Sequence, residues 1–479
     1  MPTLLRRGYL SPLIYLSNNW VSLAGVVIVT TASVFWLFLL PTTLRGEVAH
    51  PYIGILVFMI LPAAFLMGLA LIPLGMLRRE RQEGGASFFT HEFPPVNWRN
   101  RYFRRLVYFV GLTTFANLVI ASQLTYSAVN YMDSVTFCGL TCHTIMQPEY
   151  TGHQNSAHAR VACVSCHIGP GASWFVRTKL SGASQVFAAI LDTYPRPIPS
   201  PVRDLRPARE TCEVCHWPQR FDPDRLRVIP NFADDERNTF SQTVMLVKVG
   251  GGNGGIGIHG MHLGDGIRIR YASDETRQTI PWVEYRDAKG HPTAYAVSGE
   301  KPETLAQMAV REMDCIDCHN RPTHTFQMPE RAIDAALTSG AIPASLPFVK
   351  KQGLAILKQN YASRAEAAIR IPAAIETYYR SQYPDVYRDH KSDVRRAGQA
   401  LLSAYDQNVF PAMKVGWGTY PDNLGHTDFP GCFRCHDGSH ASAGGAAITQ
   451  DCGACHNLLA VQETNPKVLT ELGIATASQ

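Results

Sequence analysis

Two long stretches near the beginning of this 479-residue chain lack any charged residue. Val21–Leu40 and Tyr52–Leu77 contain no Asp, Glu, Lys or Arg, although charged residues make up 17% of the whole sequence. An apolar run of about 20 residues is long enough to cross a bilayer, and the alternative is a buried core helix. A third run, Leu106–Val129, is interrupted only by Asn117 and Gln123. The sequence therefore predicts three membrane spans at about 21–40, 52–77 and 106–129.

Positive charge is scarce between the first two runs and concentrated after the second. Only Arg45 lies between the first two, whereas the loop before the third contains Arg78, Arg79, Arg81, Arg99, Arg101, Arg104 and Arg105. Since Lys and Arg favour the cytoplasmic side of short loops, we expect a cytoplasmic N-terminus and an external region after Val129. The net charge of +5 then reflects topology, so we expect a lipid bilayer and no nucleic acid as a partner. No signal-cleavage site follows the first run, so we expect that run to be an uncleaved anchor.

No cysteine lies outside a pair, and no pair lacks a histidine directly after it. Five of the six pairs have the spacing CxxCH, and the first has one additional residue. We call each set a triplet, numbered in chain order. The triplets are Cys138, Cys142 and His143; Cys163, Cys166 and His167; Cys212, Cys215 and His216; Cys315, Cys318 and His319; Cys432, Cys435 and His436; and Cys452, Cys455 and His456.

The triplets are typical of covalent haem c attachment. Two thiols bond to the haem vinyl groups, and the following histidine reaches the iron from one face. Zinc binding or redox disulfides would explain CxxC pairs, but not a histidine at the same offset in all six. Because haem is attached outside the cytoplasm, the triplets and the loop charges agree. The sequence predicts six haem c groups in a periplasmic domain anchored in the bacterial inner (cytoplasmic) membrane.

Each iron needs a second ligand, and nine histidines after Val129 lie outside the triplets. His158, His324, His426 and His440 each lie within ten residues of a triplet, and we predict that they are ligands, although not necessarily to the adjacent haem.

The two remaining ligands are expected from different settings. One of His259 and His262, in the run GGIGIHGMHLGDG, is expected to be the fifth, with His259 preferred. Met146 is the candidate for the sixth, and core packing is its alternative. His153, His291 and His390 are interpreted as surface residues. No CxxCK variant is present, so complete ligation favours electron transfer over chemistry at an open haem.

The predicted fold is mainly α with few regular elements: an N-terminal three-helix transmembrane anchor, then a multihaem cytochrome c domain with a small inserted β-sheet. The expected order is an anchor at 1–130, haems 1–3 at 131–226, the β insert at 227–308, haem 4 and a helical region at 309–410, and haems 5–6 with a tail at 411–479. Within the insert, β-branched and aromatic residues predict strands at 243–249, 267–272, 279–285 and 293–297. Periodicity predicts helices over 330–406.

The run CHTIMQPEYTGHQNSAHARVACVSCHIGPGASWFVRTKLSG resembles the NapC/NirT family of membrane-anchored multihaem quinol dehydrogenases, and the likeness extends from Leu106 to about Phe221. The resemblance implies that electrons from membrane quinol pass to a periplasmic redox protein. It also implies that Met146 and His158 are haem ligands and that Lys179 lies near the quinol pocket. A lysine there could equally snorkel or pair with lipid phosphate.

The chain departs from the family pattern in several ways. Family members are usually tetrahaem with one span, and the first triplet here has an extra residue. The acidic partner expected two turns after Lys179 is missing, since Gln185 and Val186 lie there, and Asp192 is the nearest carboxylate. Lys179 and Asp192 are therefore the candidate quinol-site residues.

Three functions follow from these features. The first is electron transfer from menaquinol or ubiquinol to a periplasmic redox partner, with quinol dehydrogenase activity as a candidate. The second is a wiring subunit of a larger membrane complex without its own quinol site. The third is a haem-based oxyanion reductase, which complete ligation disfavours.

Overall fold

The computed structural model divides the chain into two compact units, Met1–Phe137 and Cys138–Gln479. It describes residues 19–44, 59–82 and 130–474, except 142, 169–187, 190, 203–205, 252–255, 300–304 and 306, together with scattered positions between 98 and 127. The second unit begins at the first cysteine of the first triplet.

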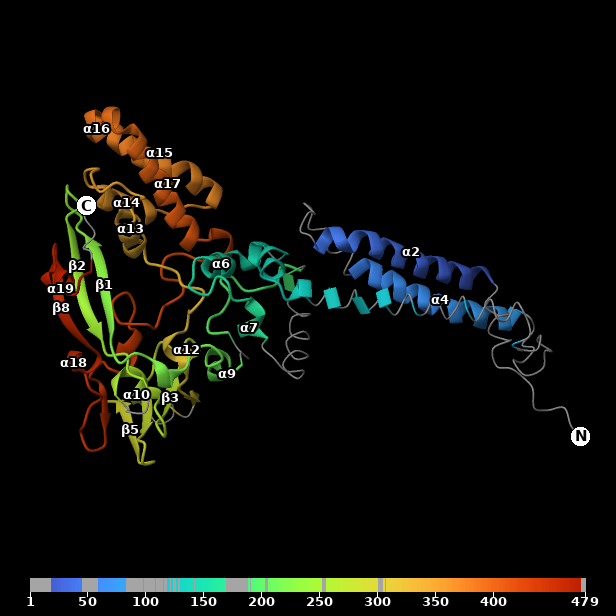
Figure 1. The fold of residues 1–479 in the computed structure, drawn as a ribbon, viewed down its shortest axis with the longest axis horizontal. Coiled ribbons are helices and arrows are strands. Elements are labelled where there is room, and N and C mark those ends of the chain that lie inside the picture. Colours follow the sequence, from blue (N-terminus) through green and yellow to red (C-terminus); the bar gives the residue numbers. More distant parts are fainter. Residues whose placement is uncertain are drawn as a thin grey trace, which may run out of the picture. The chain divides into compact units, whose positions relative to one another are not determined.

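The first unit contains two long apolar helices that run side by side, α2 (Trp20–Leu44) and α4 (Leu61–Gln82) (Figure 1). Small residues let their backbones approach closely, since a Cβ atom added to Gly25 would lie 2.7 Å from the carbonyl oxygen of Gly68. The hydroxyl of Ser22 donates a hydrogen bond to the carbonyl oxygen of Ile72 at 2.8 Å. Small side chains thus hold the pair together.

The predicted three-helix anchor is supported at one span. Among the described residues, α4 is the one helix that is long and apolar enough to cross a membrane. The first predicted span coincides with α2, of which Trp20–Ser33 is a shorter apolar stretch. The third predicted span, at 106–129, lies largely outside the described residues.

The second unit is mostly helical. Its longer helices are α6 (His143–Gln154), α13 (Pro329–Thr338), α14 (Val349–Leu357), α15 (Arg364–Gln382) and α17 (Lys391–Asn408). Short helices are α7 (Cys163–His167), α9 (Ala208–Cys212), α10 (Gly257–Leu263), α12 (Cys315–Cys318), α16 (Pro384–Asp389), α18 (Cys452–Cys455) and α19 (Lys467–Glu471). Single turns are η2 (Phe137–Thr141), which begins in the first unit, η3 (Pro218–Arg220), η5 (Pro411–Met413) and η6 (Gly431–Arg434).

Two antiparallel sheets replace the single predicted insert. The first has the order β1–β2–β8, with β1 (Arg225–Phe232), β2 (Phe240–Val247) and β8 (His456–Glu463). The second has the order β6–β3–β4–β5–β7, with β6 (Ala309–Glu312), β3 (Arg268–Ser273), β4 (Trp282–Arg286), β5 (Pro292–Val297) and β7 (His440–Ser442).

The four predicted strands overlap β2 to β5, but the idea of one self-contained sheet was wrong. Each sheet is completed by a strand from the end of the chain, β8 in the first and β7 in the second. β8 starts at the histidine of the sixth triplet, and six of the seven residues that follow it are exposed, without strict alternation. Such a strand carries little periodic signal.

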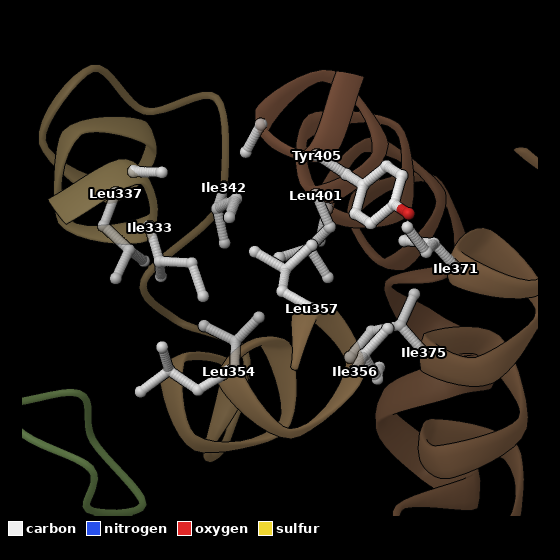
Figure 2. Packing of buried hydrophobic residues seen from close by; sticks show 14 of the residues in the cluster. Ile333, Leu337, Ile342, Leu354, Ile356, Leu357, Ile371, Ile375, Leu401 and Tyr405 are labelled. Carbon is white, nitrogen blue, oxygen red and sulfur yellow. The ribbon is translucent and has the colours of Figure 1, made fainter. Parts of the chain in front are cut away.

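The helical region, residues 329–413, contains the largest apolar core, and its helices were correctly predicted. Figure 2 shows side chains of α13, α14, α15 and α17 directed toward one another. Ile333, Leu357, Ile371, Ile375 and Leu401 have 0% exposure. These helices therefore have a core made mainly of their own side chains, to which Phe232 and Phe240 of the first sheet also contribute.

A buried ion pair joins the helical region to the first sheet. Lys350 Nζ lies 2.7 Å from Asp334 Oδ1, and both side chains are about 6% exposed. The backbone N–H of Phe232 donates to the same carboxylate oxygen at 3.3 Å. Removing either charge would leave the other buried and unpaired, which is strongly destabilising. We therefore expect this contact to hold the helical region and the first sheet in a constant arrangement.

Candidate haem-attachment and iron-ligand sites

The triplets lie on short helical turns. Both cysteines of the second, fourth and sixth triplets fall within α7, α12 and α18, and the third triplet begins at the end of α9. The carboxylate of Asp314 caps α12 by accepting from the N–H of Cys315 at 2.7 Å, and Asp451 caps α18 through Gly453 at 2.9 Å. Residues three apart share one side of a helix, so each turn presents both thiols to the same side, as attachment to one haem requires.

The first triplet lies on a different kind of turn. η2 is a π-helical turn, which is wider than an α-helical one. A wider turn can hold four residues from Cys138 to Cys142 and still return to the same side. Cys142 and the side chain of His143 lie outside the described residues.

Thiols of neighbouring triplets contact each other directly in two places. A side-chain hydrogen bond with Cys138 lowers the pKa of Cys163 to about 6. A similar bond between Cys212 and Cys315 lowers the pKa of the first thiol and raises that of the second. These contacts join triplet 1 to triplet 2 and triplet 3 to triplet 4.

Cysteines of other neighbouring triplets also lie close enough to influence one another's pKa. Burial raises the pKa of Cys166, and the nearby Cys212 raises it further. Burial likewise raises the pKa of Cys318 to about 11, with a further contribution from Cys432. Burial and then Cys432 raise the pKa of Cys455. The contacts of α7 with α9 and of α9 with α12 bring triplets 2, 3 and 4 next to one another.

Five histidines outside the triplets each lie beside the histidine of one triplet. The ring centroids are 6.2 Å apart for His167 and His324, 6.0 Å for His216 and His158, 6.2 Å for His319 and His259, 5.9 Å for His436 and His262, and 6.2 Å for His456 and His426. A metal–imidazole bond is about 2 Å long and the ring centre lies roughly 1 Å behind the nitrogen, so two imidazoles on one iron have centres about 6 Å apart. The side chains therefore fit the group that the triplets predict.

Backbone carbonyls orient several of these rings. The Nδ1 atoms of His158, His324, His262 and His436 lie 3.3, 2.9, 2.7 and 2.7 Å from the carbonyl oxygens of Pro322, Glu149, Ile258 and Thr449. A bond at Nδ1 fixes the ring and leaves Nε2 for a metal, as in many metal-ligating histidines. Burial lowers the pKa of His262 and His324, which favours the neutral imidazole that ligates metals.

The structure brings both histidines of the glycine-rich run to triplets, whereas the sequence suggested only one. His259 lies beside His319 with the ring planes 11° apart, and His262 lies beside His436. The Nδ1 atom of His259 is buried and has no hydrogen-bond partner in the described part of the chain.

His440 differs from the other predicted ligands because both of its ring nitrogens have partners. Nδ1 lies 2.8 Å from Asp437 Oδ1, and Nε2 lies 2.6 Å from the carbonyl oxygen of Ile280. The residue is 1% exposed. This arrangement favours a structural role that holds β7 to the second sheet, over the predicted ligand role.

The interpretation of His153 as a surface residue was wrong. It is 4% exposed, and its Nε2 atom lies 2.9 Å from the carbonyl oxygen of Val161. His291 and His390 are exposed, as predicted.

The candidates that the family resemblance implied, and the nearby carboxylate, are only partly described. Met146 lies half-buried on α6, and Lys179 lies outside the described residues. Asp192 is exposed and has a positive φ of 54°. A hydrogen bond from Arg196 lowers the pKa of Asp192, so this carboxylate takes up a proton less readily at neutral pH.

Binding of a bare metal ion would need a cluster of protein donor groups. Among the described residues, no group of three or more His, Cys, Asp or Glu side chains could hold such an ion. The arrangement found in that part of the chain is instead the pair of imidazoles.

Comparisons with known proteins agree with this chemistry. Residues 101–197 match the model of the NapC/NirT cytochrome c family, N-terminal region. The cytochrome c-type protein ImcH of Geobacter sulfurreducens is 39% identical over 452 residues, which cover 93% of this chain and 89% of that protein. No solved structure matches the chain.

Proposed function

The chain belongs to the NapC/NirT family of c-type cytochromes, and we propose that it is a six-haem electron carrier between membrane quinol and a redox protein outside the cytoplasm. Family membership means covalently bound haem c and membrane-associated electron transfer. The number of haems, the quinol and the topology are our proposal. A haem with two protein ligands exchanges single electrons at its iron and leaves no open position for a substrate.

The observation that carries the proposal is the set of five imidazole pairs. Each pair joins one triplet histidine to one histidine from elsewhere in the chain, with ring centres 5.9–6.2 Å apart. Chance packing of surface histidines would not select a different triplet every time. Paired imidazoles at five of the six triplets also disfavour an oxyanion reductase.

We assign the ligands by these pairs. His324 would serve the haem of triplet 2, His158 that of triplet 3 and His426 that of triplet 6. Met146 remains the candidate for the first haem. Carbonyl oxygens of Glu149 and Pro322 hold two of these rings, so the protein fixes their orientation before a metal binds.

The quinol end of the proposal rests on the family and on the sequence. Lys179 would take up a proton from menaquinol or ubiquinol, or bind one of its oxygen atoms. The region after Val129 would lie in the periplasm. Asp192 is a weaker candidate while Arg196 pairs with it. The redox partner would be a periplasmic protein or a subunit of a membrane complex.

Two measurements on the purified full-length chain test the proposal. Mass spectrometry should find six haem additions, and the spectrum should contain no high-spin haem. In liposomes that contain only this chain, a menaquinol analogue should reduce the haems, and Lys179→Met should slow this reduction at least tenfold. Lys391→Met, in the helical region, is the matched control and should not slow it.

The outcomes separate the alternatives. Six haems without quinol-driven reduction would favour the wiring subunit of a larger complex. Fewer than six haems would contradict the proposal itself. A high-spin haem would support the oxyanion reductase hypothesis instead.

A further inference from the structure

Helix α10 carries two histidines three residues apart, and each lies beside a different triplet. His259 pairs with His319 of triplet 4, and His262 pairs with His436 of triplet 5. We propose that this one helical turn supplies the second iron ligand of both haem 4 and haem 5. The inference rests on the proposed function in so far as haem must be attached at these triplets.

The position of α10 is fixed by backbone hydrogen bonds at its start. The N–H of Ile258 donates to the carbonyl oxygen of Lys248 at 2.9 Å, and that of His259 donates to Val249 at 2.8 Å. Lys248 is itself held to triplet 6, because its N–H donates to the carbonyl oxygen of Cys455 at 2.8 Å and its Nζ donates to Gly453 at 2.6 Å. The turn is thus part of the framework around the last three triplets.

The two histidines are placed to reach separate irons. Residues three apart project from the same side of a helix, but a haem iron has only two axial positions and the triplet histidine would occupy one of them, so the two rings could not both add to one iron. Each ring has a different triplet histidine at about the spacing that one iron requires. His440, which follows triplet 5 closely in the sequence, cannot take the place of His262, because both of its ring nitrogens already have partners.

Triplets 4 and 5 are also joined directly, through the residues between their cysteines. Arg434 of triplet 5 donates to the carbonyl oxygen of Asp317 in triplet 4 at 2.6 Å and to that of Arg277 at 2.7 Å. The carboxylate of Asp317, 2% exposed, accepts from the hydroxyl of Tyr271 at 2.6 Å. The attachment segments and the proposed ligands of these two haems are therefore fixed to each other by independent contacts, so their irons would keep a constant separation.

Methionine substitution tests both ligands in the full-length membrane protein. We expect His259→Met and His262→Met each to convert one His/His haem to His/Met, seen relative to the unsubstituted protein as one additional equivalent of methionine–iron charge-transfer absorption in the near infrared and one further haem with a raised potential. The double variant should convert two haems. The haem count by mass should stay at six in every variant. His440→Gln and the exposed His291→Gln are controls and should convert none.

Several results would overturn the inference. If one of the two single variants converted no haem, α10 would ligate one iron only. If the double variant converted no more haems than a single variant, both histidines would act on the same haem. Loss of haem mass at triplet 4 or 5 in the unsubstituted protein would instead contradict the proposed function. If a methionine variant fails to accumulate, His259→Gly or His262→Gly purified with imidazole replaces it. Removing the imidazole should then create one high-spin haem, and its absence would count against ligation.

Discussion

The helical region and the triplet segments of the same unit are built in opposite ways. Between residues 329 and 413, five large aliphatic side chains from four helices have no exposed surface, and the core they form, which Phe232 and Phe240 of the first sheet extend, consists of side chains alone. In the triplets, every described cysteine and every histidine of the pairs keeps some solvent-exposed surface, including those whose pKa partial burial shifts. A porphyrin between each pair of rings would cover this surface. The comparison teaches that one part of the fold is specified by its own side chains, whereas the other depends on covalent haem.

The largest difference between the two regions should appear when the full chain is produced without haem attachment. We expect the triplet segments around 138–226 and 420–456 to lose their order, because little apolar side-chain surface is buried there to offset the entropy of the chain. The helical region should stay folded. Limited proteolysis followed by mass spectrometry should therefore show fast cleavage in the triplet segments and a resistant fragment near 329–413. Equal resistance throughout would mean that the triplets fold without haem.

A large-to-small substitution in the helical core tests how far the stability of the helical region depends on its buried side chains. Ile375→Ala should lower the free energy of unfolding of the helical region by about 3 kcal/mol, since the side chain is fully buried and leaves a cavity. Ile369→Ala, on the same helix α15, is the matched control, because Ile369 is 73% exposed and should change stability by less than about 0.5 kcal/mol. Urea unfolding followed by far-ultraviolet circular dichroism measures both.

The haem spectrum of the holoprotein should be the same in both variants at 25 °C. A changed spectrum in Ile375→Ala alone would show that the helical core and the haem ligands are coupled, and that the two regions are not independent.

The same contrast explains how much the sequence could predict. The helices at 330–406 were predictable because their apolar residues recur with the period of a helix. The triplets were predictable because chemistry fixes their spacing. β8 was missed because its first residue belongs to a triplet and its side chains are largely exposed.

The ligand pairs were beyond the sequence because they join distant segments. His324 follows triplet 4 closely, yet its ring lies beside His167 of triplet 2. His440 follows triplet 5 with similar spacing, but a carboxylate and a carbonyl occupy its two nitrogens. Proximity along the chain therefore identifies candidate ligands, and only the tertiary contacts select among them and assign the haem.

The smallest effect is expected at Glu149, where the two regions meet. Glu149 lies on α6, which packs against α17 and η5, and its Oε2 is 3.2 Å from Nδ1 of His324 and 3.2 Å from Nη2 of Arg321. A carboxylate beside a ligand ring stabilises the more positive, oxidised iron. Glu149→Gln removes that charge and leaves the Arg321 cation nearby, so the potential of one haem should rise by roughly 30–60 mV, up to a tenfold change in its redox equilibrium.

An optical redox titration of the full-length protein measures this shift as the displacement of one component out of six. Glu366→Gln is the matched control, since Glu366 pairs with Arg370 within the helical region and should leave every component in place. The direction of the shift is the sensitive part of the test. An unchanged or lowered potential in Glu149→Gln would contradict the assignment of His324 to the haem of triplet 2.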